Sequence, residues 1–167
     1  MGRGPEAAST EMVEAAFGPE GAAVCSELVR RLQDRDKAIV ERAARTLKKI
    51  AEHDGSFLFA WRKALLAEAN RALDVRVQWN LSIILGKLPL NGSDKALAVE
   101  LMFERLSDKS GLNRTMAMQA LMDLSENDKA LRARIMPFVV ESLEHGSPAM
   151  RARSRRLLGL KRFEAGL

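Results

Sequence analysis

The chain has few of the residues that build disulfides, membrane spans or aromatic-rich sites. Its 167 residues include one cysteine, two histidines, two tryptophans and no tyrosine. A single cysteine excludes an internal disulfide and is typical of proteins from a reducing compartment. No apolar run approaches the roughly 20 residues that cross a bilayer, and the first residues lack the apolar core of a secretion signal. We therefore expect a cytoplasmic protein that does not enter a membrane.

The residues that are present favour a folded, helical chain. Hydrophobic residues make up 47% of the sequence and charged residues 29%, a balance that argues against general disorder. With so few aromatics, the interior must be filled mainly by leucine, alanine, valine, isoleucine and methionine, a composition that is compatible with helices. No stretch alternates between apolar and polar with a period of two, so we expect no sheet.

A repeat of helix pairs is the strongest pattern in the sequence. In the second helix of each pair, a capping residue precedes a core leucine by 11 positions, and the intervals between these leucines are 38, 36 and 37 residues. A helix pair that recurs every 35–45 residues or so is typical of an α-solenoid, in which stacked neighbours bury one continuous core. The four pairs of cap and leucine are Asp36/Leu47, Asp74/Leu85, Ser110/Leu121 and Ser147/Leu158.

The pair that begins near Ile135 carries a family resemblance. It has Pro137 inside the first helix, then Met150-Arg151, then Leu157-Leu158-Gly159 in the second helix. With these residues the chain resembles a HEAT-repeat protein over roughly residues 19–161. The resemblance implies an all-α fold, a right-handed α–α superhelix of about four HEAT-like helix pairs. It also implies that Arg114 and Arg151 bond to turn aspartates of stacked repeats.

The ends of the chain and the turns complete the expected organisation. We expect residues 1–18 to form a mobile N-terminal lead-in with a short helix, residues 19–161 a single solenoid domain, and residues 162–167 a C-terminal tail. Gly146 follows a helix end where a left-handed cap is expected. A third helix is predicted from Phe57 to about Ala72. In the helix that begins near Ser93, the predicted apolar residues are Leu97, Leu101, Met102 and Leu106.

Residues typical of catalysis or metal binding have structural explanations. Cys25 lies on an apolar stripe, which favours a buried thiol over a nucleophile. His53 and His145 each stand at a helix C-terminus, and neither has a second ligand at zinc spacing. Glu100 and Glu104 lie four residues apart with Arg105 adjoining, and they fit a solvated helix face better than an acid–base pair. We therefore expect no catalytic residue, no metal, no cofactor and no enzyme activity.

Two groups of residues are candidates for binding a partner. Trp79 and Ile83 point away from the apolar side of their helix, and Arg45 and Lys48 flank them on the neighbouring second helix. Packing against adjacent second helices is the alternative explanation for the two apolar side chains. The other group is basic: the formal net charge of +5 resides in the last 21 residues. It comprises Arg151, Arg153, Arg155, Arg156, Lys161 and Arg162.

These observations predict a non-catalytic scaffold that binds a macromolecular partner, most simply a protein, on the surface lined by the second helices. Binding of nucleic acid through the basic C-terminal helix is one alternative, by analogy with HEAT-like DNA alkylation repair proteins. The same arginines also suit the charged outer face that a terminal repeat needs. A third possibility, a subunit of an enzyme, follows from resemblance to the repeats of phycobilin lyases.

Overall fold

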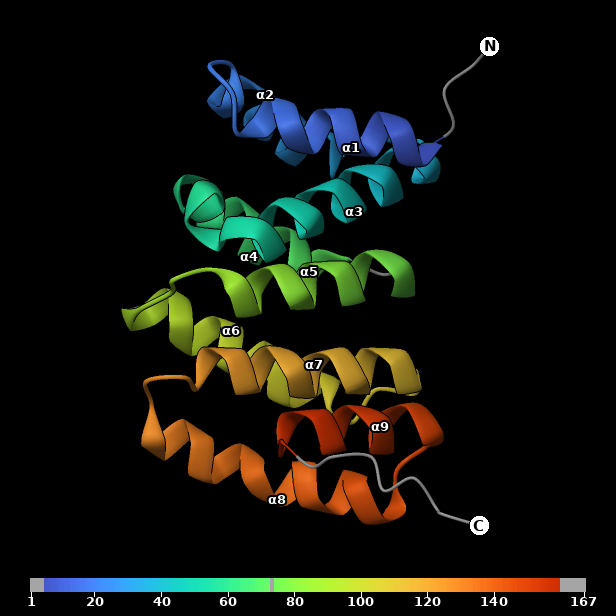
Figure 1. Ribbon diagram of the computed structural model, residues 1–167, viewed down its shortest axis with the longest axis vertical. Coiled ribbons are helices and arrows are strands. Elements are labelled where there is room, and N and C mark those ends of the chain that lie inside the picture. Colours follow the sequence, from blue (N-terminus) through green and yellow to red (C-terminus); the bar gives the residue numbers. More distant parts are fainter. Residues whose placement is uncertain (1–4, 73, 160–167) are drawn as a thin grey trace.

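The protein folds as a stack of helix pairs, seen in a computed structural model that describes residues 5–72 and 74–159 (Figure 1). No strand occurs in these ranges. The second helix of each pair is α3, α5, α7 or α9, and α1 precedes the first pair. The helices are α1 (Pro5–Ala16), α2 (Gly21–Arg31), α3 (Lys37–Asp54), the 3₁₀ helix η1 (Gly55–Trp61), α4 (Arg62–Arg71), α5 (Val75–Lys87), α6 (Gly92–Arg105), α7 (Gly111–Leu124), α8 (Lys129–His145) and α9 (Pro148–Leu157).

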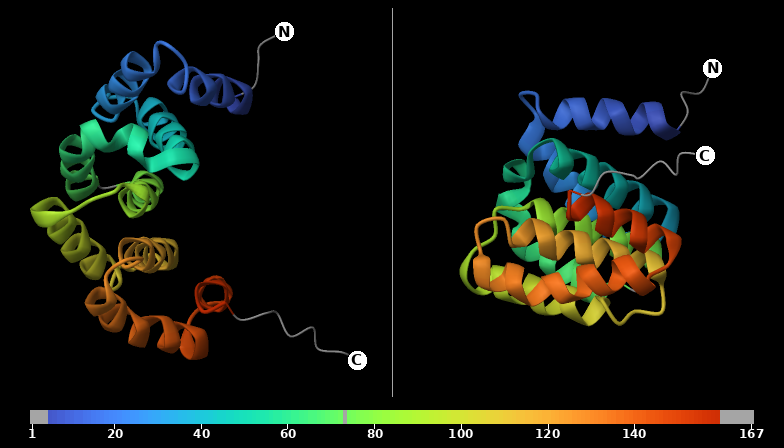
Figure 2. Two further views of the ribbon diagram at one scale, coloured as in Figure 1. Left: turned by 60° about the vertical axis from the view of Figure 1, so that its left-hand side comes forward. Right: turned by 60° about the horizontal axis from the view of Figure 1, so that its bottom comes forward.

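The helices lie in two layers that curve together. The second helices contact one another in one series, α3 with α5, α5 with α7 and α7 with α9, and α1 extends that series by packing on α3. The first helices α2, α4, α6 and α8 form the outer layer of the arc (Figure 2). We call the inner surface, formed by the exposed and half-buried side chains of α3, α5, α7 and α9, the concave face. The predicted all-α solenoid fold is confirmed.

The predicted N-caps of the second helices are all present. The carboxylate of Asp36 accepts from the backbone N–H of Ala38 and that of Asp74 from the N–H of Arg76, both at 2.8 Å. The hydroxyls of Ser110 and Ser147 accept from backbone N–H groups three residues further on, both at 3.3 Å. Each cap satisfies one backbone donor that the helix leaves without a partner.

The marker leucines of the repeat form the centre of the core. Leu47, Leu85 and Leu121 are fully buried and belong to one continuous apolar cluster that runs through the stack. Leu158 is half-buried against that cluster, because α9 has no following helix pair among the described residues. The repeat predicted from the spacing of these leucines therefore corresponds to the core.

Two local predictions are wrong. The segment predicted as one helix from Phe57 begins as the 3₁₀ helix η1 and becomes α-helical only at Arg62. Gly146 does not have the left-handed conformation: its φ is −71°. Glycine is needed there for space, because a Cβ would lie 2.3 Å from the carbonyl oxygen of Ser142 and 2.8 Å from the Cβ of Met150.

Helix α6 turns a different face to the core from the one predicted. Leu97, predicted on the apolar side, is 62% exposed, whereas Arg105, which adjoins the predicted solvated face, is only 6% exposed. The α6 residues that are buried are Ala98, Val99, Met102 and Arg105. Glu100, on the other side, is solvated as expected and lies 3.7 Å from Arg134.

The buried guanidinium of Arg105 joins three helices. It donates to the hydroxyl of Ser82 at 2.6 Å and to the backbone carbonyl of Gln78 at 3.0 Å, both in α5, and to the backbone carbonyl of Ala69 in α4. Burial lowers the pKa of Arg105, and Asp108 and Glu104 oppose that shift. A buried charge needs hydrogen-bond partners, and those of Arg105 all belong to the preceding helix pair. Arg105 therefore connects the second and third helix pairs.

Further polar bonds join successive second helices. Asn113 donates to the side-chain carbonyl of Gln78 at 2.6 Å, across 35 residues. Arg153 donates to that of Gln119 at 2.9 Å, across 34 residues. The arginine–aspartate ladder implied by the HEAT resemblance is not formed by Arg114, which donates instead to the backbone carbonyl of Asp108 in its own turn at 2.6 Å.

The N-terminal segment contributes more structure than a short helix. The helix α1 begins at Pro5 and packs against α2 and α3, and the hydroxyl of Ser9 lies 3.3 Å from that of Thr46 in α3. Both side chains are buried. Thus α1 occupies the place of a second helix that stacks on α3. The predicted tail, residues 162–167, lies outside the described residues.

Candidate protein-binding surface

Three of the four predicted partner-binding residues lie together on the concave face. Arg45, Lys48 and Trp79 line a pocket of about 280 Å³ between α1, α3 and α5. Ser9 of α1 closes one side of it. The pocket exists because α3 presents successive turns toward the inner surface while α1 and α5 flank it.

Trp79 is half-buried rather than fully exposed. The ammonium group of Lys48 lies 5.3 Å from the centre of its indole ring, within the range of a cation–π contact. The ring is therefore held by a neighbour on α3, and part of its surface still lines the pocket.

Ile83, the fourth predicted residue, does not belong to this surface. It is 7% exposed, so the expectation that it projects from the concave face is wrong. Helix α5 lies between α3 and α7 and packs against both. A helix in the middle of the stack therefore has little exposed width, and Ile83 is covered although it points away from the main core.

Ion pairs connect charged side chains of the pocket with neighbouring residues. One carboxylate oxygen of Glu41 lies 2.8 Å from the guanidinium of Arg45, and the other lies 3.2 Å from the guanidinium of Arg76 in α5. Lys48 lies 3.7 Å from Glu52. Exposed pairs of this kind contribute little stability, but they orient the side chains that a partner would meet.

The described basic residues of the C-terminal helix differ in exposure. Arg155 and Arg156 are exposed, whereas Arg151 and Arg153 are half-buried; Lys161 and Arg162 lie outside the described residues. Burial and the charge of Arg156 lower the pKa of Arg153, while Asp123 and Glu52 raise it. In the described part of the predicted patch, Arg155 and Arg156 are therefore the most exposed members.

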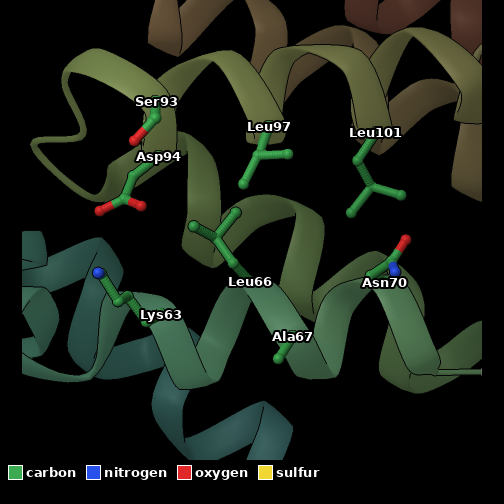
Figure 3. A pocket seen from close by; sticks show the side chains of 8 residues that line it. All are labelled: Lys63, Leu66, Ala67, Asn70, Ser93, Asp94, Leu97 and Leu101. Carbon is green, nitrogen blue, oxygen red and sulfur yellow. The ribbon is translucent and has the colours of Figure 1, made fainter.

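A larger hollow, which was not predicted, lies in the outer layer. Leu66, Leu97 and Leu101 face one another between α4 and α6, with Lys63 and Asp94 at the edge (Figure 3). The pocket volume is about 510 Å³. We call it the outer groove. It was missed because Leu97 has the spacing of a core residue, and only the stacking of α6 on α4 shows that it faces outward.

Cys25 and His53 have the chemistry of catalytic residues but lie in apolar or aromatic surroundings. Cys25 is buried, and this burial raises the pKa of its thiol, which disfavours the nucleophilic thiolate. The ring of His53 packs against that of Phe17 with 4.8 Å between ring centres. Residues 5–72 and 74–159 hold no group of three or more histidine, cysteine or carboxylate side chains that suits a metal ion. None of the helices described is both long and apolar enough to cross a membrane.

Comparison with known proteins supports the fold. No family model and no curated protein matches the chain. One solved structure does: a chain from the complex of CpcE and CpcF of phycocyanin lyase from Nostoc sp. PCC7120, with a TM-score of 0.60 and 22% sequence identity. The match covers 92% of this chain and 99% of that chain. At this identity the likeness shows a shared fold.

The expectation that the chain is not an enzyme needs correction. It rests on the absence of familiar catalytic motifs from a helical-repeat sequence. The similar chain has the same fold and is part of a phycocyanin lyase. The inference from a motif-poor solenoid to a protein without enzymatic function is therefore wrong.

Proposed function

We propose that the chain is a HEAT-repeat subunit of a two-protein, lyase-like complex and that it binds its partner through the concave face. The observation that carries this proposal is the end-to-end match with a chain of the CpcE–CpcF complex, which covers 92% and 99% of the two chains. A match of that extent covers the whole stack rather than one repeat. The two chains therefore have concave faces of similar length.

The geometry of the concave face supports protein binding. Its centre holds a half-buried aromatic residue, Trp79, beside Arg45 and Lys48. Tryptophan and arginine dominate the binding energy of many protein interfaces. As parts of the same proposal, residues 19–161 form the solenoid domain, α1 extends it before residue 19, residues 162–167 follow it, and the protein acts in the cytoplasm.

The test is affinity capture from the source cells, followed by native mass spectrometry of the captured assembly. We expect a complex of this chain with a second helical-repeat protein, and phycocyanin-type proteins are the first substrates to assay with it. The concave variant Arg45→Glu with Trp79→Ala should lose the partner, whereas Leu97→Asp in the outer groove should retain it. The opposite result would move the interface to the outer layer, and capture of the chain alone would refute the proposal.

Nucleic-acid binding is the second candidate, favoured by the exposed Arg155 and Arg156 of α9. Two phosphate contacts would give a slope of about −1.8 for log K against log salt on duplex DNA. We expect such binding to be weak and to vanish at physiological salt. Tight binding that survives physiological salt would rank this candidate first, and nuclease treatment before affinity capture gives an independent check.

A further inference from the structure

The pocket beside Trp79 is strongly basic. Four cationic side chains line it, Arg42, Arg45, Lys48 and Lys49, together with a single carboxylate, that of Glu41. All five come from α3. Residues three, four and seven apart share a helix face, so this cluster follows from the helical spacing of the sequence. Its residues were not all predicted: Arg42 and Lys49 extend the patch beyond Arg45 and Lys48.

Two of the four cations are available to a ligand. The carboxylate of Glu41 is taken up by Arg45 and Arg76, and Lys48 pairs with Glu52 and the ring of Trp79. Arg42 and Lys49 have no carboxylate within ion-pair distance in the part of the chain that the structure describes. Arg42 is exposed and Lys49 half-buried, on successive turns of the same face. A ligand with separated negative charges would match this pair.

The neighbourhood of Trp79 favours an acidic peptide over a nucleic acid. Single-stranded nucleic acids stack their bases on open aromatic faces along a groove with continuous positive charge. Here Lys48 covers one face of the indole, and further along the concave face Lys87 is paired with Asp123 at 3.1 Å. The Lys87–Asp123 pair thus interrupts the positive charge along the concave face, and the remaining indole surface suits an apolar side chain between acidic residues.

We propose that this pocket binds an acidic segment of the partner protein, with carboxylates on Arg42 and Lys49 and an apolar side chain against Trp79. The inference deepens the proposed function, on which it rests, by naming the chemistry of the partner. Charge complementarity is its basis: the pocket carries an excess of positive charge, and no ion pair within the described residues occupies Arg42 or Lys49.

The probe is a short fluorescein-labelled peptide in which glutamates alternate with leucines, measured by fluorescence anisotropy on the full chain at low salt. The double variant Arg42→Glu with Lys49→Glu should weaken its binding at least tenfold. The control Lys109→Glu with Lys129→Glu makes the same change in net charge at exposed positions away from the pocket and should stay within twofold. If the first variant does not fold by circular dichroism, Arg42→Gln with Lys49→Gln replaces it, with an expected loss of at least threefold.

Three results would overturn the inference: no binding of the acidic peptide, equal losses in both double variants, or tighter binding of an oligothymidylate than of the peptide. A counterpart peptide with glutamine for glutamate should bind at least tenfold more weakly. Native mass spectrometry of the captured complex separates the two proposals. A complex that forms without any peptide affinity refutes only the acidic-segment inference, whereas peptide binding without a captured partner supports the pocket and refutes the proposed function.

Discussion

The guanidinium of Arg105 joins the second and third helix pairs through three hydrogen bonds. Its acceptors are the hydroxyl of Ser82 and the backbone carbonyls of Gln78 and Ala69. Arg105→Ala would leave these buried acceptors without a donor, so we expect the free energy of unfolding to fall by about 2–4 kcal/mol. Urea denaturation measures this, with the exposed Arg35→Ala as control. A loss under about 1 kcal/mol would show that water replaces the guanidinium.

A surface carboxylate provides a pH test at the same scale. Hydrogen bonds from Arg30 and Arg31, at 2.7 and 2.9 Å, lower the pKa of Glu27 to about 2. Because the folded pKa lies below the unfolded one, the stabilisation is complete above the unfolded value and disappears as the pH falls through the folded value. We expect NMR titration of the Glu27 carboxyl to show this low pKa. In Arg30→Gln with Arg31→Gln it should return toward 4.5, and an unchanged titration would contradict the pairing.

At the scale of the helices, all four N-caps predicted from the sequence are present in the structure. The carboxylate of Asp74 caps α5, so Asp74→Ala should lower the free energy of unfolding by about 1 kcal/mol. Asp74→Asn keeps an oxygen acceptor and should cost only a few tenths of that amount. Thermal or urea denaturation compares the two. Equal losses for alanine and asparagine would assign the effect to the charge of Asp74 rather than to its hydrogen bond.

Whether an element was predicted depends on how local its cause is. Caps are predictable because a side chain two or three positions before a helical N–H decides them. The 3₁₀ helix η1 could not be predicted from neighbouring residues in this way. It begins at Gly55, which lies against another helix: a Cβ there would be 1.9 Å from the carbonyl oxygen of Lys87 at the end of α5. In α6 the positions of Leu97 and Arg105 likewise follow from contacts with other helices rather than from the spacing within α6.

At the scale of the whole molecule, the solenoid was predictable and its surfaces only in part. The repeat interval gives the stack, and helical periodicity places Trp79 opposite the core of its own helix. Which side chains are exposed on the concave face depends on how the helices pack together. Ile83 is covered between neighbouring helices, whereas Arg42 and Lys49 line the pocket beside Trp79 with Ser9 of α1. The outer groove arises between two first helices, so no single helix pattern reveals it.

Leu121 tests whether the stack behaves as one cooperative body. It is fully buried in α7, and α7 packs against α5, α6, α8 and α9. In a solenoid, stability comes from each repeat and from its interfaces with neighbours, so a defect at the centre weakens both sides. We expect Leu121→Ala to lower the free energy of unfolding by about 2–5 kcal/mol, from lost burial and the cavity that it leaves.

The same helix supplies the control for that substitution. Leu112 lies in α7 as well but is 42% exposed, so Leu112→Ala should cost less than about 1 kcal/mol. Urea denaturation measures both losses, and hydrogen exchange locates them. In Leu121→Ala, amide protection should fall in α5 and in α9, on both sides of the substituted helix. Protection lost from α7 alone, or equal losses for the two leucines, would mean that the central helix is not coupled to its neighbours through Leu121.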